Sequence, residues 1–253
     1  MNLIILTDQD QFNDTHYRLT DHRAEHIRTI LKLEVGDHLE IGLLNGPLGM
    51  GVIEKVGSSE VIISPRLMHE APVSAFEVDL ICALPRPQTL KKVLFTCAMM
   101  GVRRLDLIRA NRVERSYYQS PLLQPDNYTP FLIEGLSQGK LTRLPEVAIH
   151  HRFRPFFEDT LPNREGSGAG CGAKILPDPE AQRTMPDVLI AKEGHLWLAI
   201  GPEGGWVPFE VDLMKQIGFQ AVTLGRWVLR VEHAITAALA QIELIKMPTG
   251  DQS

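Results

Sequence analysis

The sequence predicts an α/β protein in which a small β-barrel domain over residues 1–71 precedes a larger α/β domain over residues 72–253. Two observations predict this fold class. In the first part, short apolar runs are separated by turn signals, which is typical of a small barrel of strands. From Phe76 onward, short buried-type strands alternate with amphipathic helical patterns. This alternation predicts a mostly parallel sheet covered by helices.

Composition limits the class of protein. The chain has 253 residues, of which 44% are hydrophobic, and this is enough to bury a sizeable core. No apolar run approaches the roughly 20 residues that cross a bilayer. Met1–Leu6 lacks the basic flank and cleavage site of a signal peptide. The three cysteines are widely spaced, which disfavours disulfides and a zinc ribbon. These features predict a cytoplasmic protein without a membrane segment.

The first domain reads as strands around one helix. Ala24–Leu31 is predicted to be helical, with Ile27, Ile30 and Leu31 on its apolar face. Asn45-Gly46 predicts a hairpin turn. Pro65 and Pro72 are expected to bracket a linker. The expected strands are Leu3–Leu6, His38–Leu44, Met50–Val56 and Val61–Ser64.

The second domain is expected to alternate strand and helix. One helix is expected to be capped by Thr89 and to end at Gly101, with an apolar face of Leu90, Val93, Leu94, Cys97 and Ala98. Further helical patterns lie near Phe131–Leu136, from Pro208 to Ile217 and over Val231–Lys246. The expected strands are Phe76–Leu84, Leu105–Ile108, Val147–His150, Leu196–Ile200 and Ala221–Leu224.

Residues 162–187 interrupt this alternation. They contain the run Gly166–Gly172, which is rich in glycine, and four prolines. Neither a helical nor a strand period is evident, so the segment is predicted to be a flexible surface insertion.

Charge is unevenly distributed along the chain. The net charge is −5, but residues 71–154 carry 12 lysines and arginines against 7 aspartates and glutamates. A basic segment inside an acidic protein favours contact with RNA phosphates, although its charge can equally pair with the acidic parts. The candidate RNA-binding residues are Arg86, Lys91, Arg103, Arg104, Arg112 and Arg115.

Two glycine-containing loops follow the last two expected strands. Gly201–Gly205 has the sequence Gly-Pro-Glu-Gly-Gly, and Leu224-Gly225 follows the next strand. Ligands bind at the carboxyl ends of strands in open α/β sheets, and glycine permits close backbone approach. The spacing matches neither a Walker loop nor a dinucleotide fingerprint. Plain strand-to-helix turns therefore remain an equal alternative, and residue type alone favours a surface arginine at Arg230, paired with Glu203 or Glu232.

The combination of the two loops is more specific. Gly201–Trp206, followed by Leu224-Gly225-x-x-Val228-Leu229-Arg230-x-Glu232-x-Ala234, resembles the signature of the 16S ribosomal RNA uridine-N3 methyltransferase family of the SPOUT superfamily. Leu31-Lys32-Leu33 and Val35-Gly36-Asp37 are also similar to an N-terminal segment of that family. Trp227 and His233 depart from the pattern, in which Arg and Thr are frequent at these positions.

This resemblance implies a PUA-like RNA-binding barrel, a SPOUT domain with a C-terminal trefoil knot, and a homodimer that acts on 16S rRNA or the small ribosomal subunit. It also implies an S-adenosyl-L-methionine pocket. The cofactor-binding residues it implies are Ile200, Gly201, Pro202, Glu203, Gly204, Gly205, Leu224, Gly225, Val228, Leu229 and Arg230.

The expected reaction transfers a methyl group to uracil N3. Because that nitrogen carries a hydrogen at neutral pH, a protein group must accept the proton or stabilise the anion. Arg230 is the candidate stabiliser, and Glu203 is a weaker candidate as base or cofactor contact. No cluster of residues predicts a metal. The alternatives are a non-catalytic rRNA-binding protein of ribosome assembly that keeps the fold, and an enzyme that uses another adenosine-containing ligand.

Overall fold

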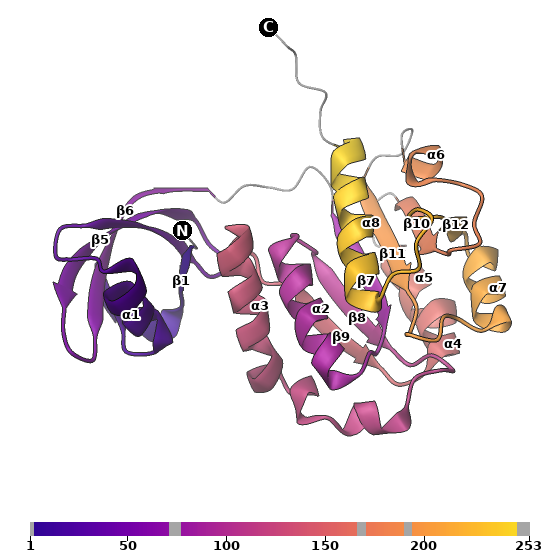
Figure 1. Ribbon diagram of the computed structural model, residues 1–253, viewed down its shortest axis with the longest axis horizontal. Coiled ribbons are helices and arrows are strands. Elements are labelled where there is room, and N and C mark those ends of the chain that lie inside the picture. The colour runs from indigo at the N-terminus through magenta and orange to yellow at the C-terminus, as the bar shows by residue number, and fades with distance from the viewer. Residues whose placement is uncertain (1–2, 71–76, 166–170, 190–193, 247–253) are drawn as a thin grey trace, which may run out of the picture. The chain divides into compact units, whose positions relative to one another are not determined.

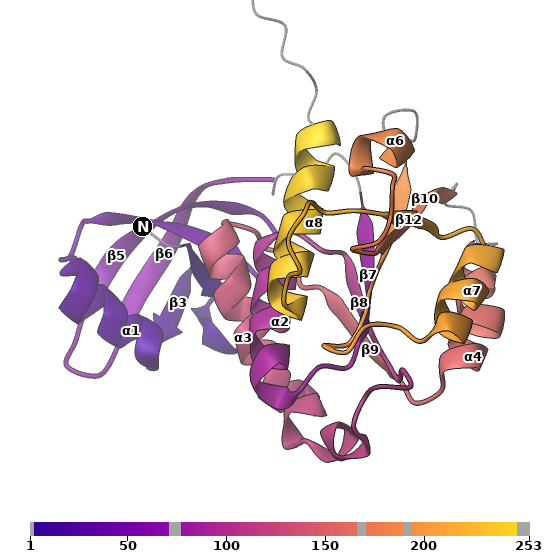
Figure 2. The ribbon, with the colours of Figure 1, turned by 45° about the vertical axis from the view of Figure 1, so that its right-hand side comes forward.

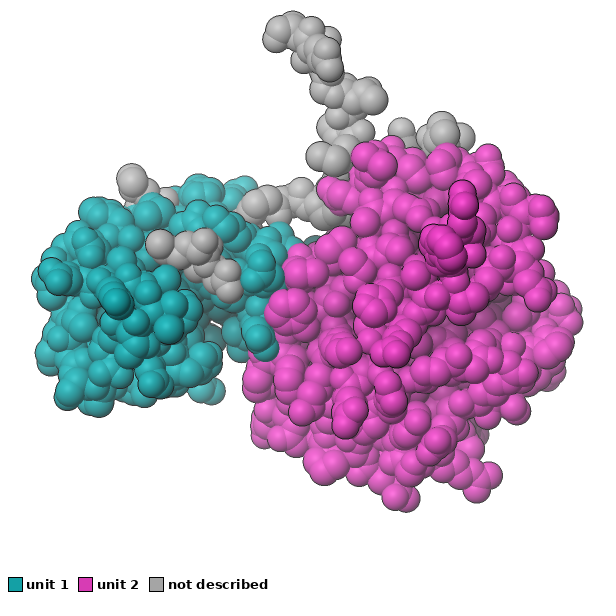
Figure 3. All heavy atoms as spheres, in the orientation of Figure 1, with its two compact units in different colours: residues 1–73, 133–144 teal, residues 74–132, 145–253 magenta. Residues whose placement is uncertain are grey.

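A computed structural model describes residues 3–70, 77–165, 171–189 and 194–246. The chain forms two compact units (Figure 3). The first unit comprises Met1–Val73 and Ile133–Leu144, and the second comprises Ser74–Leu132 and Pro145–Ser253. The expected domain boundary at residues 71–72 lies outside the described residues. The segment 133–144 is assigned to the first unit, although the sequence analysis placed it in the second domain.

The first unit contains a six-stranded sheet in the order β1-β4-β5-β6-β3-β2. β1 pairs with β4 in parallel, and the other neighbours are antiparallel. Leu6, Leu19, Ile41, Ile53 and Ile63 point into one core from these strands. The strands are β1 (Ile4–Leu6), β2 (Gln11–Asn13), β3 (His16–Leu19), β4 (His38–Leu43), β5 (Leu48–Val56) and β6 (Val61–His69).

Two expectations for this unit are wrong. The helix α1 (His22–His26) continues into a π-helical turn, η2 (Ile27–Leu31), where Ile27 is buried and Ile30 is 67% exposed. The wider turn keeps Leu31 against the core and moves Ile30 outward. Pro65 does not begin a linker, because β6 runs on to His69. Pro65 pairs with Gly51 beyond the end of β3, where no second neighbour requires its missing N–H.

The second unit contains a six-stranded parallel sheet in the order β12-β10-β11-β7-β8-β9. The expected parallel α/β architecture is therefore confirmed. Its strands are β7 (Val78–Ala83), β8 (Arg104–Ile108), β9 (Glu146–His150), β10 (Cys171–Pro177), β11 (His195–Ile200) and β12 (Gln220–Val222). Its longer helices are α2 (Pro87–Met99), α3 (Pro125–Gly139), whose last part belongs to the first unit, α7 (Pro208–Gln216) and α8 (Val231–Lys246).

Helices cover both faces of this sheet. Figures 1 and 2 show α2 and α8 on one face, and α4 (Phe153–Pro155) with α7 on the other. Because strand side chains alternate, β7 sends Ile81 toward the Phe153, Phe156 and Phe157 cluster on the second face. The expected apolar face of α2 is buried on the first face. That helix begins at Pro87 rather than at Thr89, whose buried side chain lies inside its first turn.

The expectation of a flexible insertion over 162–187 is wrong. Leu161–Glu165 is helical (α5), and β10 lies inside the sheet between β11 and β12. Ile175 and Leu176 are completely buried. Met185–Leu189 forms a further helix, α6, packed against α8. Only residues 166–170 of the expected glycine-rich loop lie outside the described residues.

Candidate functional site

The parallel sheet of the second unit brings together loops that are distant in sequence. Because all its strands point the same way, their carboxyl ends meet at one edge. Arg86 follows β7, Arg112 follows β8, and Asp178 follows β10. The two glycine loops follow β11 and β12 at the same edge.

A cavity of about 840 Å³ lies at this edge, here called the glycine-loop cavity. All eleven residues of the expected cofactor site line it. The structure adds residues from the loop after β10 and from the start of α7 and α8. The additional lining residues are Leu176, Pro177, Asp178, Pro179, Glu180, Trp206, Pro208, Val211, Asp212, Lys215, Trp227, Val231 and Ala234.

The loop after β8 makes one contact with the first glycine loop and one with the start of α7. Arg112 donates a hydrogen bond from Nη1 to the carbonyl oxygen of Gly204. Glu210, which is completely buried, accepts hydrogen bonds from the backbone N–H groups of Asn111 at 2.7 Å and Val207 at 3.0 Å. The carboxylate thereby fixes the start of α7 to the loop after β8.

The second glycine loop is held by α8 and by its own backbone geometry. Gln241 donates from Nε2 to the carbonyl oxygen of Leu224 at 3.1 Å. Gly225 has φ of +130°, a conformation that residues with a Cβ rarely adopt. Trp227 and Val228 follow it and are 75% and 86% exposed. The loop therefore presents backbone and apolar side chains at the rim of the cavity.

Trp206 supplies an unused hydrogen-bond donor. Its Nε1 is buried and has no hydrogen-bond partner among the described residues. A Cβ added at Gly201 would lie 3.1 Å from this atom, so glycine lets the indole pack against the loop. A buried donor that lines a cavity without a partner indicates a position where a ligand acceptor fits.

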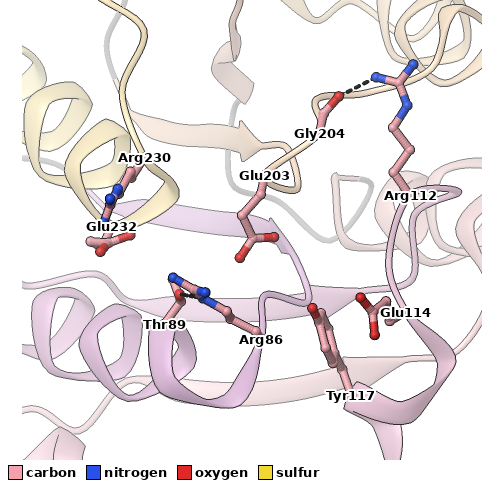
Figure 4. A pocket seen from close by; sticks show the side chains of 9 residues that line it. All are labelled: Arg86, Thr89, Arg112, Glu114, Tyr117, Glu203, Gly204, Arg230 and Glu232. Carbon is pink, nitrogen blue, oxygen red and sulfur yellow. Dashed lines mark hydrogen bonds between the residues drawn. The ribbon is translucent and has the colours of Figure 1, made fainter.

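A second cavity, of about 470 Å³, adjoins the first and is here called the charged cavity. Figure 4 shows Glu203, Arg86 and Arg230 directed into it from three separate elements. No ion pair joins these three side chains among the described residues, so their charges remain available to a ligand. The lining residues are Arg86, Thr89, Arg112, Glu114, Tyr117, Glu203, Gly204, Arg230 and Glu232.

Neighbouring groups shift the pKa of two side chains in the charged cavity. Partial burial raises the pKa of the Tyr117 hydroxyl, and the carboxylates of Glu114 and Glu203 raise it further, while Arg86 opposes them. Partial burial also raises the pKa of Glu232, but a backbone hydrogen bond and Lys92 outweigh it, so the net pKa is lowered. Lys92 donates to Glu232 Oε1 at 3.1 Å and so ties α2 to α8. Glu232 is therefore a structural anion rather than a free one.

The two cavities share Glu203, Gly204 and Arg230. These residues form the boundary between the glycine-loop cavity and the charged cavity. Two ligands bound in the two spaces would meet at this boundary.

The candidate RNA-binding residues do not form one patch. Arg86 and Arg112 lie at the carboxyl edge and line the charged cavity, and Arg115 is exposed beside it. Lys91 is exposed on α2, over the ring of Phe131. Arg103 and Arg104 lie at the opposite edge of the sheet, at the start of β8.

Arg103 and Arg104 are partners of carboxylates in the structure. Arg103 contacts buried Asp79 and also Glu77, and Arg104 contacts buried Asp106 and also Glu146. Their charges compensate carboxylates that have left water, so the structure assigns these two arginines a structural role, and their contact with RNA stays a prediction.

Several lining residues were not predicted from the sequence. Asp178 and Glu180 were missed because β10 was taken for part of an insertion. The run Ala173–Leu176 was the available signal for this strand. Tyr117 and Glu114 lie on a short helical segment, and nothing in their spacing indicated a site.

Metal sites and membrane spans are two further features that bear on function. Among the described residues, no group of three or more His, Cys, Asp or Glu side chains is arranged to hold a metal ion. Within those same ranges, every helix is too short or too polar to cross a membrane.

Similar proteins were found by sequence. The chain is 29% identical over 222 residues to the ribosomal RNA small subunit methyltransferase E of Treponema pallidum, covering 88% of this chain and 82% of that protein. It is 25% identical over 241 residues to ribosomal RNA small subunit methyltransferase E 1 of Borreliella burgdorferi, covering 94% of this chain and 95% of that protein.

Similar solved structures share the fold along nearly the whole chain. A ribosomal RNA small subunit methyltransferase E from Neisseria gonorrhoeae, bound to S-adenosyl methionine, has a TM-score of 0.73 at 18% identity and covers 97% of this chain and 98% of that chain. A methyltransferase from Legionella pneumophila in complex with the same cofactor has a TM-score of 0.74 at 20% identity, covering 96% and 98%. The family model described as an RNA methyltransferase domain matches residues 72–243, more than half of the chain, and the chain therefore belongs to this RNA methyltransferase family.

Proposed function

We propose that this protein is an S-adenosyl-L-methionine-dependent methyltransferase that methylates N3 of a uridine in 16S rRNA. The observation that carries the proposal is the pair of adjoining cavities that share Glu203, Gly204 and Arg230. A methyl donor in one space and an RNA base in the other would bring the reacting atoms together at that boundary. Such alignment is the main task of an enzyme whose cofactor supplies the chemistry.

The glycine-loop cavity offers the apolar surface, hydrogen-bond donors and hydrogen-bond acceptors that would bind S-adenosyl-L-methionine. Val231, Ala234 and Leu224 offer apolar surface for a purine ring. The glycine backbones and the unpaired Trp206 Nε1 offer hydrogen-bonding groups for polar edges. The carboxylates of Asp178, Glu180 and Asp212 would accept from ribose hydroxyls or an ammonium group. When bound, the cofactor supplies a methyl group on a good sulfonium leaving group.

Arg230 and Glu203 would manage the charge and the proton of the acceptor base. Glu203 would take the N3 proton before the transfer, which frees the in-plane lone pair of N3 to accept the methyl group that the bound cofactor would supply. Arg230 stabilises the negative charge that develops on the ring as the N3–H bond breaks. Both side chains line the charged cavity and also border the cofactor space, which these roles require.

The remaining features of the proposal concern fold and assembly. We propose a SPOUT-type trefoil knot at the C-terminus of the second unit, a PUA-like RNA-binding role for residues 1–71, a homodimer, and a cytoplasmic location. The curated relatives from Treponema and Borreliella, whose names refer to the small ribosomal subunit, support the proposed rRNA substrate. The exposed apolar loop at Trp227 and Val228 supports a covered, dimeric site.

The test combines genetics with a purified reaction. Nucleoside mass spectrometry should find 3-methyluridine in 16S rRNA of the parent strain and none in a strain lacking this protein. Purified protein should restore it on small-subunit particles from that strain when the labelled cofactor is added. Binding of rRNA without binding of S-adenosylhomocysteine would identify an assembly protein instead. Methylation at another base atom would contradict the N3 assignment.

A further inference from the structure

Arg86 is held in the charged cavity by its surroundings. It lies just before α2, and its carbonyl oxygen accepts hydrogen bonds from the N–H groups of Thr89 and Leu90, both at 2.9 Å. Its side chain donates from Nε to Thr89 Oγ1 at 3.2 Å, and Thr89 is only 4% exposed. These contacts fix the guanidinium and leave its two terminal nitrogens without a partner among the described residues. Figure 4 shows them facing the space in front of Glu203.

Three of the side chains that line the charged cavity, Arg86, Glu203 and Arg230, together offer two hydrogen-bond donors and one acceptor on separate elements. Arg86 and Arg230 can only donate, and an ionised Glu203 can only accept. Arg86 lies in the loop after β7 and Glu203 in the loop after β11. Arg230 is the residue that precedes α8. A ligand that complements this set must present two acceptors and one donor.

The Watson–Crick edge of uracil has that pattern. It carries the acceptor O4, the donor N3–H and the acceptor O2 in a row. Cytosine carries an amino donor in place of O4 and lacks the hydrogen on N3, so it would place a donor against an arginine and an acceptor against Glu203. Where the bound base excludes water from these exposed side chains, a mismatch of this kind costs more than a missing contact, because both groups stay unpaired.

We infer that Arg86, Glu203 and Arg230 together read the uracil edge, with Arg86 and Arg230 binding the two carbonyl oxygens on either side of the N3–H that Glu203 accepts. Arg86 is thus a specificity-determining residue. This inference rests on the proposed function and deepens it, since it states how uridine is distinguished from cytidine at the site of methyl transfer.

A phosphate ligand is the competing use of Arg86, because the residue belongs to the basic segment. The cavity itself argues against it. Glu114, Glu203 and Glu232 line the same space as the arginines. The carboxylates are interspersed with Arg86, Arg112 and Arg230, so the lining is mixed in charge rather than uniformly basic. A neutral base edge that presents both donors and acceptors suits such a lining better than a phosphate, which would face Glu203 and Glu114 as well as the arginines.

The experiment combines substitutions of Arg86 in the protein with replacement of single oxygen atoms by sulfur in the RNA base, and compares their separate and joint effects on methyl transfer. Small-subunit particles are reconstituted with uridine, 2-thiouridine or 4-thiouridine at the position mapped by mass spectrometry, because sulfur accepts hydrogen bonds poorly. Methyl transfer kcat/KM is measured for the wild type, Arg86→Ala and Arg86→Lys. Arg154→Ala is the charge-matched control, since its side chain is 67% exposed on α4 and lines neither cavity.

We expect Arg86→Ala to lower kcat/KM on uridine by about 10- to 100-fold, with unchanged affinity for S-adenosylhomocysteine. One of the two sulfur substitutions should lower the kcat/KM of the wild type and have little further effect on that of Arg86→Ala. The effects of the two substitutions on kcat/KM should therefore depart from additivity by about 10-fold. Arg86→Lys should be intermediate, and Arg154→Ala should behave as the wild type.

Three outcomes oppose the inference, and they are distinguishable. Equal sulfur sensitivity in the wild type and Arg86→Ala would show that Arg86 does not touch the base. If the slope of log affinity against log salt also falls by about one, Arg86 binds a phosphate. An inactive wild type on uridine particles would instead refute the proposed function, and the inference with it.

Discussion

Arg112 donates a hydrogen bond to the carbonyl oxygen of Gly204, which joins the loop after β8 to the first glycine loop. The two loops also pack closely, since a Cβ on Gly204 would lie 3.2 Å from Arg112 Cδ. The arginine therefore shapes the boundary between the two cavities, in addition to any contact that it makes with RNA.

Replacing Arg112 with Ala should loosen this boundary. We expect the affinity for S-adenosylhomocysteine to fall by about 3- to 10-fold, the effect of losing one charged hydrogen bond at an exposed position. Titration calorimetry measures this directly, and Arg112→Lys should recover part of the loss. Unchanged cofactor affinity combined with a weaker salt dependence of RNA binding would show that Arg112 acts on phosphate alone.

Arg230 should matter more in the transition state than in the ground state. Arg230→Ala is expected to lower kcat by roughly 100-fold or more, as with the loss of one oxyanion donor, and to change S-adenosylhomocysteine affinity little. Arg230→Lys should rescue partly, because a point charge does not reproduce the planar fork. Higher pH should partly restore Arg230→Ala, since more uracil is then deprotonated. A loss confined to cofactor affinity would make Arg230 a cofactor ligand.

Gly225 tests whether the second glycine loop needs its backbone geometry. Its φ is +130°, and nothing lies within 4 Å of a Cβ placed there, so substitution affects conformation rather than space. Gly225→Val should strain the loop by about 1–3 kcal/mol and weaken S-adenosylhomocysteine binding. Gly36→Val is the matched control, because Gly36 has φ of +94° and open space in the first unit. The control should lose stability and keep its affinity for S-adenosylhomocysteine. Equal affinities in the two variants would show that the second glycine loop does not bind the cofactor.

Arg103 should act on stability and not on RNA affinity. Its guanidinium contacts Asp79, whose side chain is completely buried and lies 3.2 Å from His195. Arg103→Ala leaves that carboxylate short of a partner, and we expect a loss of about 3 kcal/mol in the free energy of unfolding. Lys91→Ala, at an exposed position, should change the melting temperature little. A flatter salt dependence of RNA binding with unchanged stability would restore the RNA-binding assignment.

Asp106 should give the protein an acid-sensitive stability. Burial raises the pKa of this carboxyl, but hydrogen bonds from His150 and Arg164, with the charges of Arg164 and Arg104, lower it below the usual range. A carboxyl whose pKa is lowered by folding stabilises the folded state at pH values above its ordinary pKa of about 3.9. This stabilisation is lost as the pH falls through the lowered pKa of the folded state. Asp106→Asn should therefore be less stable at pH 7 and lose less on acidification. Parallel urea-denaturation series from neutral to acid pH would contradict this.

Pattern and periodicity sufficed for most of the second unit. β7, β8, β11 and α8 were predicted because each buries a run with the right period. β10 is not predicted, because its apolar run, Ala173–Leu176, includes Lys174 and is flanked by glycines and prolines that usually mark loops. Lys174 turns its ammonium to the carbonyl oxygen of Ile217 at 2.6 Å, a contact invisible in the sequence.

The candidate site was predictable where one loop carries it and not where several loops meet. The two glycine loops were identified from their residues, and the cavity they line agrees with that grouping. The basic segment could not be resolved from charge density, because β8 separates its parts. β8 has five residues, and each advances the strand by about 3.3 Å. Arg103 precedes this strand and Arg109 follows it, so the two arginines lie at opposite edges of the sheet.

The segment 133–144 completes the first unit. The N–H of Leu3 donates to the carbonyl oxygen of Ser137 at 3.1 Å, and Thr142 Oγ1 donates to the carbonyl oxygen of Gly46 at 2.6 Å. During synthesis the first unit therefore cannot close until Leu144 has emerged, by which time β7, α2 and β8 have been made. β7 in turn must wait for β11, whose first residue is His195, before both of its edges are paired. The nascent chain thus carries an unpaired parallel strand edge for more than a hundred residues, so late pairing of β7 with β11 should slow folding.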